Sequence, residues 1–167
     1  MESKARLLGH SIHQMLIVFP LGLLATAVVF DVIYLVGNAL LWADFAYWLI
    51  ISGLIGGALA APFGLIDWIA IPSGTRAKRV GAVHGLGNVV VLALFVVSAL
   101  LRAELPTNAP TLAYVCSFAG AALAMFTAWL GGELVTRLGV GVYSQANLDA
   151  PSSLHAKQRD EAAIGSR

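Results

Sequence analysis

Two histidines near the start of the chain have the type and spacing needed to bind a metal or a haem. His10 and His13 lie three residues apart, just before the first long apolar run. Residues three apart on a helix share one face, so both imidazoles are expected to point toward the same place. Neutral imidazole is the commonest metal ligand among protein side chains. What these histidines can do therefore depends on which other side chains the fold brings to them.

The composition indicates the kind of protein that must position these histidines. Of its 167 residues, 59% are hydrophobic and 11% are charged, whereas about a quarter of the residues of a soluble domain are charged. The chain is therefore predicted to be a membrane protein. Its formal net charge is only +1, which argues against nucleic-acid binding because that function needs a basic excess. Its single cysteine, Cys116, excludes a disulfide within one chain.

Four apolar runs are long enough to cross a bilayer, which takes about 20 residues of helix. They cover residues 15–36, 45–70, 82–101 and 112–134, with short polar turns between them. Short connections make neighbouring helices antiparallel. The predicted fold is all-α, an integral membrane up-down-up-down four-helix bundle made by residues 1–142. Residues 143–167 are predicted to be a polar tail outside the membrane, with little order.

The basic residues predict which way the bundle faces. In this topology nine of the ten lysines and arginines fall at the end that carries both termini and the middle loop, and only Arg102 falls at the other end. Because basic residues favour the cytoplasmic side, both termini are predicted to be cytoplasmic. The expected location is the bacterial inner membrane, with the lipid bilayer around a multi-pass chain.

Ionisable side chains are costly inside a membrane, so each one there is a candidate functional residue. The topology brings five of them, from all four helices, to the cytoplasmic end: His10, His13, Asp67, His84 and Glu133. Two further side chains are expected close to them, Asn88 and Trp68. The sequence therefore predicts a site at this end of the bundle.

Ordinary structural roles for these residues remain open beside the functional one. His84 and Asn88, four residues apart, can form a hydrogen-bonded pair, and Glu133 can pair with Arg137 one turn later. Asp67 can bond the basic loop 76–79 or cap the third helix.

One acidic residue of the first helix lies too far along that helix to join the cluster. Asp31 comes 18 residues after His13, about 27 Å along the axis at 1.5 Å per residue. It is expected to pair with Arg102 or to cap a neighbouring helix.

Two kinds of centre fit the cluster. A b-type haem needs one or two histidines on facing helices, and His13 with His84 is the predicted pair because the first and third helices are diagonal in a simple bundle. His10 would then serve a haem propionate or a second ligand position. A non-haem iron, zinc or manganese centre would use the three histidines together with Asp67 and Glu133.

Four motifs occur in order along the chain. They are Gly9-His10-x-x-His13 followed by Pro20, Gly64-Leu65-Ile66-Asp67-Trp68, Val83-His84-Gly85-x-x-Asn88, and Gly131-Gly132-Glu133-Leu134-Val135 followed by Gly139-Val140-Gly141-Val142. Together they resemble the signature of a bacterial four-helix membrane family, domain of unknown function 2231. Some members of that family resemble this chain as a membrane portion placed ahead of a Rieske iron-sulfur domain, which implies redox work.

The resemblance also bears on the ligand set. In those members a histidine often occupies the position of Glu133. Replacement of one metal-ligating side chain by another is what a ligand position would tolerate. The prolines that usually follow the first two histidines are replaced by Ser11 and Gln14, and a frequent histidine before the Phe-Pro pair is replaced by Val18. A site that needs four histidines is therefore not expected.

The leading hypothesis from the sequence is a haem b electron-transfer protein that exchanges electrons with a redox protein or a quinone. A non-haem metal site with enzymatic chemistry is one alternative. A non-catalytic accessory subunit of a membrane complex is another, and a homo-oligomer is compatible with each. The chain has no HExxH, GxSxG, P-loop or dinucleotide motif, so nothing supports a serine hydrolase or a nucleotide enzyme.

Overall fold

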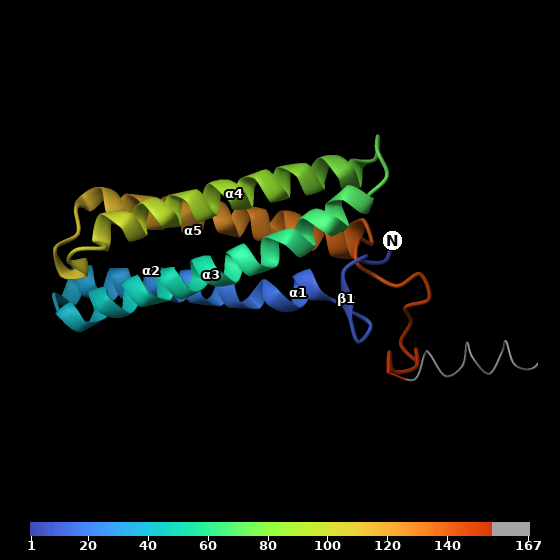
Figure 1. Ribbon diagram of the computed structural model, residues 1–167, viewed down its shortest axis with the longest axis horizontal. Coiled ribbons are helices and arrows are strands. Elements are labelled where there is room, and N and C mark those ends of the chain that lie inside the picture. The colour runs from blue at the N-terminus through green and yellow to red at the C-terminus, as the bar shows by residue number, and fades with distance from the viewer. Residues whose placement is uncertain (155–167) are drawn as a thin grey trace, which may run out of the picture.

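A computed structural model describes residues 1–154, in which four long helices pack side by side (Figure 1). Four helices are long and apolar enough to cross a membrane: Ile12–Gly37, Leu40–Ala70, Arg76–Arg102 and Thr111–Arg137. Each of them contains one of the predicted spans. The predicted all-α membrane fold is thus confirmed, while the part of the tail beyond residue 154, with Lys157, Arg159 and Arg167, lies outside the described residues.

The first and last spans are each built from two pieces. The first consists of α1 (Ile12–Leu16) and α2 (Val18–Gly37). Pro20 has no N–H to donate to the carbonyl of Leu16, where α1 ends. The last consists of α5 (Thr111–Gly132) and a π-helical turn, η2 (Glu133–Arg137).

The two middle spans are continuous helices, α3 (Leu40–Ala70) and α4 (Arg76–Arg102). The backbone N–H of Lys78 donates to the side chain of Thr75, which caps the start of α4. Proline 62 lies inside α3 without ending it. A short 3-10 helix, η1 (Pro106–Asn108), connects α4 to α5.

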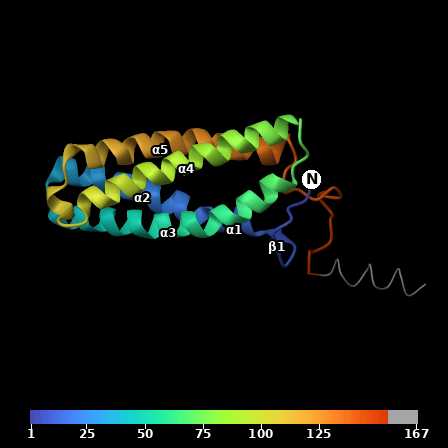
Figure 2. The same cartoon turned by 45° about the horizontal axis from the view of Figure 1, so that its top comes forward.

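The helices lie antiparallel to their neighbours in the chain and form two hairpins (Figures 1 and 2). α2 packs along α3, and α4 packs along α5; the hairpins meet through α3 with α4 and α5 with α2. The first span and α4 are therefore diagonal to one another. The N-terminus, the α3–α4 turn and the end of the last span lie at one end of the bundle, called here the histidine end.

The two hairpins are structural repeats of one another. Adding 71 to the residue number relates α2 to α4. The buried residues of α2 then correspond to three buried residues of α4: Leu24 to Phe95, Ala27 to Ser98 and Asp31 to Arg102. A shift of 67 residues relates α3 to α5 and superposes the buried sets in the same way: Ala46, Ile50, Gly53 and Ala60 become Ala113, Ser117, Gly120 and Thr127.

Packing between helices follows the same register. A Cβ on Gly53 would lie 2.7 Å from the side chain of Leu24, and one on Gly120 would lie 2.9 Å from the ring of Phe95. Gly53 and Gly120 are counterparts, and so are Leu24 and Phe95. Because α2 and α4 are diagonal, the two repeats are related by a pseudo-two-fold axis that runs along the bundle.

Candidate functional site

His13 and His84 are held in the same way in the two repeats. Nδ1 of His13 donates to the carbonyl oxygen of Ala60 at 3.0 Å, and Nδ1 of His84 donates to that of Thr127 at 2.8 Å. Ala60 and Thr127 are counterparts under the 67-residue shift, just as the two histidines are under the 71-residue shift. Both side chains are half-buried.

Each imidazole also lies against a glycine one turn beyond the carbonyl that it bonds. A Cβ on Gly64 would lie 2.7 Å from Cε1 of His13, and a Cβ on Gly131 would lie 3.1 Å from Cε1 of His84. These glycines, also counterparts, leave room for the rings close to the backbone of α3 and α5. Small residues let membrane helices approach closely, and here two glycines leave the space that the histidine rings occupy.

The hydrogen bonds define the chemistry that the rings offer. With the Nδ1 proton donated to a carbonyl, a neutral imidazole keeps its lone pair on Nε2, the atom that can bind a metal. His13 and His84 stand at counterpart positions on diagonal spans. The site thus presents two imidazoles across the pseudo-two-fold axis, each with Nδ1 bonded to a backbone carbonyl.

Asn88 distinguishes the second histidine from the first. Its side-chain amide donates to Nε2 of His84 at 3.2 Å and to the carbonyl of His84 at 2.9 Å, so the predicted His84–Asn88 pair is present. Its Oδ1 accepts from the hydroxyl of Thr127 at 3.0 Å. The counterpart of Asn88 is Ile17, which offers no hydrogen bond, so only the second half of the site has a polar partner for Nε2.

His10 does not share a helix with His13, contrary to the expectation from their spacing. It lies in strand β2 (His10–Ser11), which pairs with β1 (Arg6–Leu7) in a short antiparallel hairpin. Leu8 and Gly9 both have positive φ values, 50° and 88°, and make the tight turn that delays the helix until residue 12. His10 is exposed, with Nε2 3.4 Å from the hydroxyl of Ser153.

Asp67 holds the N-terminal segment and not the basic loop 76–79. Its buried carboxylate accepts hydrogen bonds from the hydroxyl of Ser3 at 2.7 and 2.9 Å, from the backbone N–H of Lys4 at 2.7 Å and from that of Ala5 at 3.3 Å. The N-terminal segment is also fixed from the other side, because the Met1 amine donates to the carbonyl of Gly139 at 2.7 Å. Residues 1–5 are thereby tied across the histidine end of the bundle.

Replacing Asp67 with alanine is expected to release this N-terminal segment. The change removes a carboxylate that accepts hydrogen bonds from three donors, and bonds to charged groups contribute about 1.5–3 kcal/mol each. Hydrogen exchange at Lys4 and Ala5 should accelerate at least tenfold, a factor that corresponds to about 1.4 kcal/mol. The measurement is exchange detected by mass spectrometry in detergent, with Glu133→Ala as the control. Unchanged protection of residues 3–5 in Asp67→Ala would contradict this role.

Glu133 and Trp68 also have partners away from the histidines. Glu133 accepts from Arg76 at 2.7 Å, and not from Arg137 as its spacing predicted. The indole N–H of Trp68 donates to the carbonyl of Lys78 at 3.1 Å, and the Lys78 amine lies 4.1 Å from the centre of the indole ring. These two residues therefore fix the turn between α3 and α4.

The structure does not gather the five predicted ligands at one point. In residues 1–154 no three histidine, cysteine, aspartate or glutamate side chains lie close enough together to hold a metal ion. Asp67 and Glu133 face residues 3–5 and Arg76, and His10 lies outside the helices. What remains of the predicted site is the pair His13 and His84 with its support from Asn88.

At the far end of the bundle the expected pairing of Asp31 with Arg102 is confirmed. Both side chains are fully buried, and the guanidinium donates to the two carboxylate oxygens at 2.6 and 2.8 Å. Arg102 also donates to the hydroxyls of Ser98 and Ser117, both at 3.1 Å. The spacing in the sequence reflects the repeat, because Asp31 follows His13 by 18 residues and Arg102 follows His84 by the same number.

Comparison with known proteins agrees with this architecture. Residues 9–144 match the model of a family described as predicted membrane protein (DUF2231). Neither a curated protein nor a solved structure matches the chain. The matched region contains α1 to α5 and η2, and with them every helix that is long and apolar enough to cross a membrane within the described residues. The chain is therefore a multi-pass membrane protein and belongs to the DUF2231 family of predicted membrane proteins.

Proposed function

We propose that this protein is a membrane-integral electron-transfer module that binds a b-type haem between His13 and His84. The observation that carries the proposal is the equivalent support of the two imidazoles. Each donates its Nδ1 proton to a backbone carbonyl of the next span, at counterpart positions of the two repeats. Nε2 is then the atom that each ring offers as an axial ligand.

A flat, nearly symmetric ring would suit the symmetry of the pair. A pseudo-two-fold axis between the histidines gives both faces of such a ring the same kind of surroundings. Gly64 and Gly131 bring the backbones of α3 and α5 close to the imidazoles. Hydrogen bonds from Nδ1 to carbonyl oxygens fix the ring orientation and increase the basicity of Nε2. A bound haem supplies one-electron transfer, while the protein supplies the ligands, their orientation and an apolar setting.

The same geometry separates this proposal from the non-haem alternative. A mixed centre would need Asp67 and Glu133 as ligands, and each carboxylate is bonded elsewhere, to Ser3 and to Arg76. If these carboxylates bound a metal, Asp67 would lose its hydrogen bonds to the N-terminal segment and Glu133 would lose its ion pair with Arg76. The two histidines need no such rearrangement, apart from a turn of the Asn88 amide away from His84.

The proposed site lies at the end of the bundle where the basic residues collect. Arg76, Lys78 and Arg79 are in or beside the α3–α4 turn there, whereas Arg102 at the far end is buried against Asp31. By the positive-inside rule this end faces the cytoplasm, and the membrane is the bacterial inner membrane. A redox protein at this surface, or a quinone dissolved in the bilayer, would exchange electrons with the site.

An absorption spectrum tests the proposal. The protein is expressed with haem supplied, purified in detergent, and measured oxidised and dithionite-reduced. We expect a Soret band and the sharp reduced α band of a six-coordinate haem. His13→Ala and His84→Ala should each lose most of the Soret absorbance, and His10→Ala should retain it because His10 lies outside the helices.

The controls separate loss of haem from loss of fold. Circular dichroism and size-exclusion chromatography of each variant establish whether the helices persist. A helical, monodisperse wild type with no Soret band overturns the proposal. Elemental analysis then decides between the two alternative functions. Stoichiometric iron, zinc or manganese favours a non-haem centre, and a metal-free protein favours an accessory subunit.

A further inference from the structure

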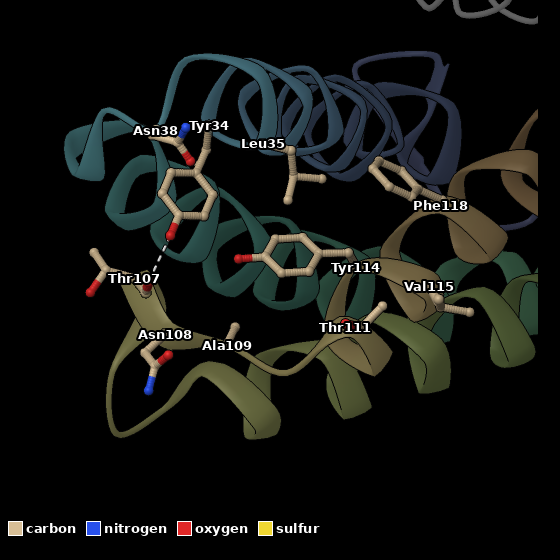
Figure 3. A pocket seen from close by; sticks show the side chains of 10 residues that line it. All are labelled: Tyr34, Leu35, Asn38, Thr107, Asn108, Ala109, Thr111, Tyr114, Val115 and Phe118. Atoms are coloured by element: carbon tan, nitrogen blue, oxygen red, sulfur yellow. Dashed lines mark hydrogen bonds between the residues drawn. The ribbon is translucent and has the colours of Figure 1, made fainter.

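A pocket of about 400 Å³ opens at the end of the bundle opposite the histidines (Figure 3). It lies between the end of α2, η1 and the start of α5. Three aromatic rings line it, together with apolar and polar side chains; among them are Tyr34, Tyr114, Phe118, Val115, Thr107 and Asn38. The two tyrosine rings are stacked, with centroids 6.4 Å apart and planes 25° apart.

Tyr114 is the distinctive residue of this pocket. Its side chain is only 7% exposed, and the guanidinium of Arg102 lies 4.5 Å from the centre of its ring. Figure 3 shows its hydroxyl directed into the pocket without a hydrogen bond to another lining residue, whereas the hydroxyl of Tyr34 donates to the carbonyl of Thr107 at 2.6 Å. A rigidly held phenol thus has its hydroxyl available to a ligand.

The pocket is also a place where the two repeats differ. The counterpart of Tyr114 is Tyr47, which does not line the pocket and packs edge-on against Trp48 with centroids 5.4 Å apart. The counterpart of Tyr34 is Leu105, so the position related to Tyr34 carries no aromatic ring. The repeat places a tyrosine both at position 47 and at position 114. Only Tyr114 has a second tyrosine, Tyr34, beside it in a pocket.

The lining defines the chemistry of a ligand. Stacked aromatic rings favour a flat ring, and the Tyr114 hydroxyl can donate to an oxygen on it. Leu35, Val115 and Phe118 belong to membrane-spanning helices and provide apolar contacts along the bilayer, while Asn38 and Thr107 are at the polar end. A flat ring that carries oxygen and has an apolar tail matches these surfaces.

We propose that this pocket binds the ring of a prenylated quinone or quinol, with its tail along α2 and α5. The site is separate from the histidine pair, because the pocket residue Tyr34 comes 21 residues after His13, about 32 Å along the helix axis. This binding site is distinct from the quinone proposed above as an electron partner of the histidine pair, and it does not rest on haem binding. A protein that shows no Soret band can still bind the quinone, so the two proposals fail independently.

Binding of a short-tailed ubiquinone, decylubiquinone, tests the site in purified full-length protein in detergent. Isothermal titration calorimetry measures the affinity. We expect saturable binding by the wild type and about five- to tenfold weaker binding by Tyr114→Phe, which removes one hydrogen-bonding hydroxyl. Val115→Trp should abolish binding, since it places a large ring at the exposed edge of the pocket. Tyr47→Phe is the matched control and should bind like the wild type.

Three results would overturn the proposal. The first is the absence of saturable binding by a helical, monodisperse wild type. The second is equal affinity in Tyr114→Phe, Val115→Trp and Tyr47→Phe, which would place the quinone elsewhere. The third is phospholipid that copurifies with the wild type, is lost in Val115→Trp and is not displaced by decylubiquinone.

Discussion

Arg102→Ala is expected to destabilise the protein more than any other single substitution considered for it. The change leaves the Asp31 carboxylate fully buried without its bidentate partner. Removing one member of a buried ion pair typically costs about 3–5 kcal/mol. For a chain of this size that loss corresponds to a fall of roughly 10 °C or more in the unfolding temperature. Thermal unfolding followed by circular dichroism in detergent measures it.

The internal repeat makes a sharper version of this experiment available. Because positions 31 and 102 are counterparts, the double variant Asp31→Arg, Arg102→Asp should recover part of the lost stability. Full recovery is not expected, since Arg102 also donates to Ser98 and Ser117, whose counterparts are Ala27 and Ile50.

Exchanging the serines as well provides the control for the repeat. Adding Ala27→Ser, Ile50→Ser, Ser98→Ala and Ser117→Ile rebuilds the arginine site in the first hairpin and should raise the unfolding temperature further. A charge-swapped protein no more stable than Arg102→Ala, with or without the serine exchange, would contradict the equivalence of the two hairpins. An Arg102→Ala protein that unfolds within a few degrees of the wild type would contradict the importance of the ion pair.

Gly64→Ala is the substitution expected to disturb the histidine site most. Its Cβ would lie 2.7 Å from Cε1 of His13, a distance that forces the imidazole away from the Ala60 carbonyl. Overpacking of this kind costs about 1–3 kcal/mol. Gly131→Ala should have a smaller effect at His84, where the corresponding distance is 3.1 Å. Nitrogen NMR of the imidazoles measures the change directly, because the fixed Nδ1–H tautomer of the displaced ring is lost.

A neighbouring glycine provides the control. Gly132 lies in the same helix as Gly131 and has nothing within 4 Å of an added Cβ. Gly132→Ala should therefore leave both imidazoles unchanged, and unfolding should be unaffected or occur at a slightly higher temperature, because alanine is the better helix former. If Gly64→Ala behaves like Gly132→Ala, the glycine is not what positions His13.

Several local features of the site could be predicted because they depend on sequence distance alone. The His84–Asn88 pair follows from a spacing of four residues on one helix. The Asp31–Arg102 pair follows from two charges at the same membrane depth, where an unpaired charge is costly. The internal repeat was not predicted from the sequence, although Asp31 and Arg102 each follow a histidine by 18 residues.

Other partners in the site depended on contacts between distant segments. The carboxylate of Asp67 faces residues 3–5, a polar segment without periodicity, and Glu133 meets Arg76 of another helix and not Arg137 of its own. His10 was misplaced because the turn at Leu8 and Gly9 replaces the first turn of helix with a short hairpin. In each case spacing along one element was a poor guide, because the side chain bonds a segment from elsewhere.

The sequence by itself determined that this protein has four membrane-spanning helices. Runs of apolar residues longer than a bilayer is thick can satisfy their backbone only as helices, whatever their neighbours are. Only the tertiary structure decided which polar side chains meet at the histidine end. The rotation and height of each helix are set by close contacts such as Gly53 with Leu24 and Gly64 with His13, and a rotation of one helix by a single residue would bring a different set of side chains together.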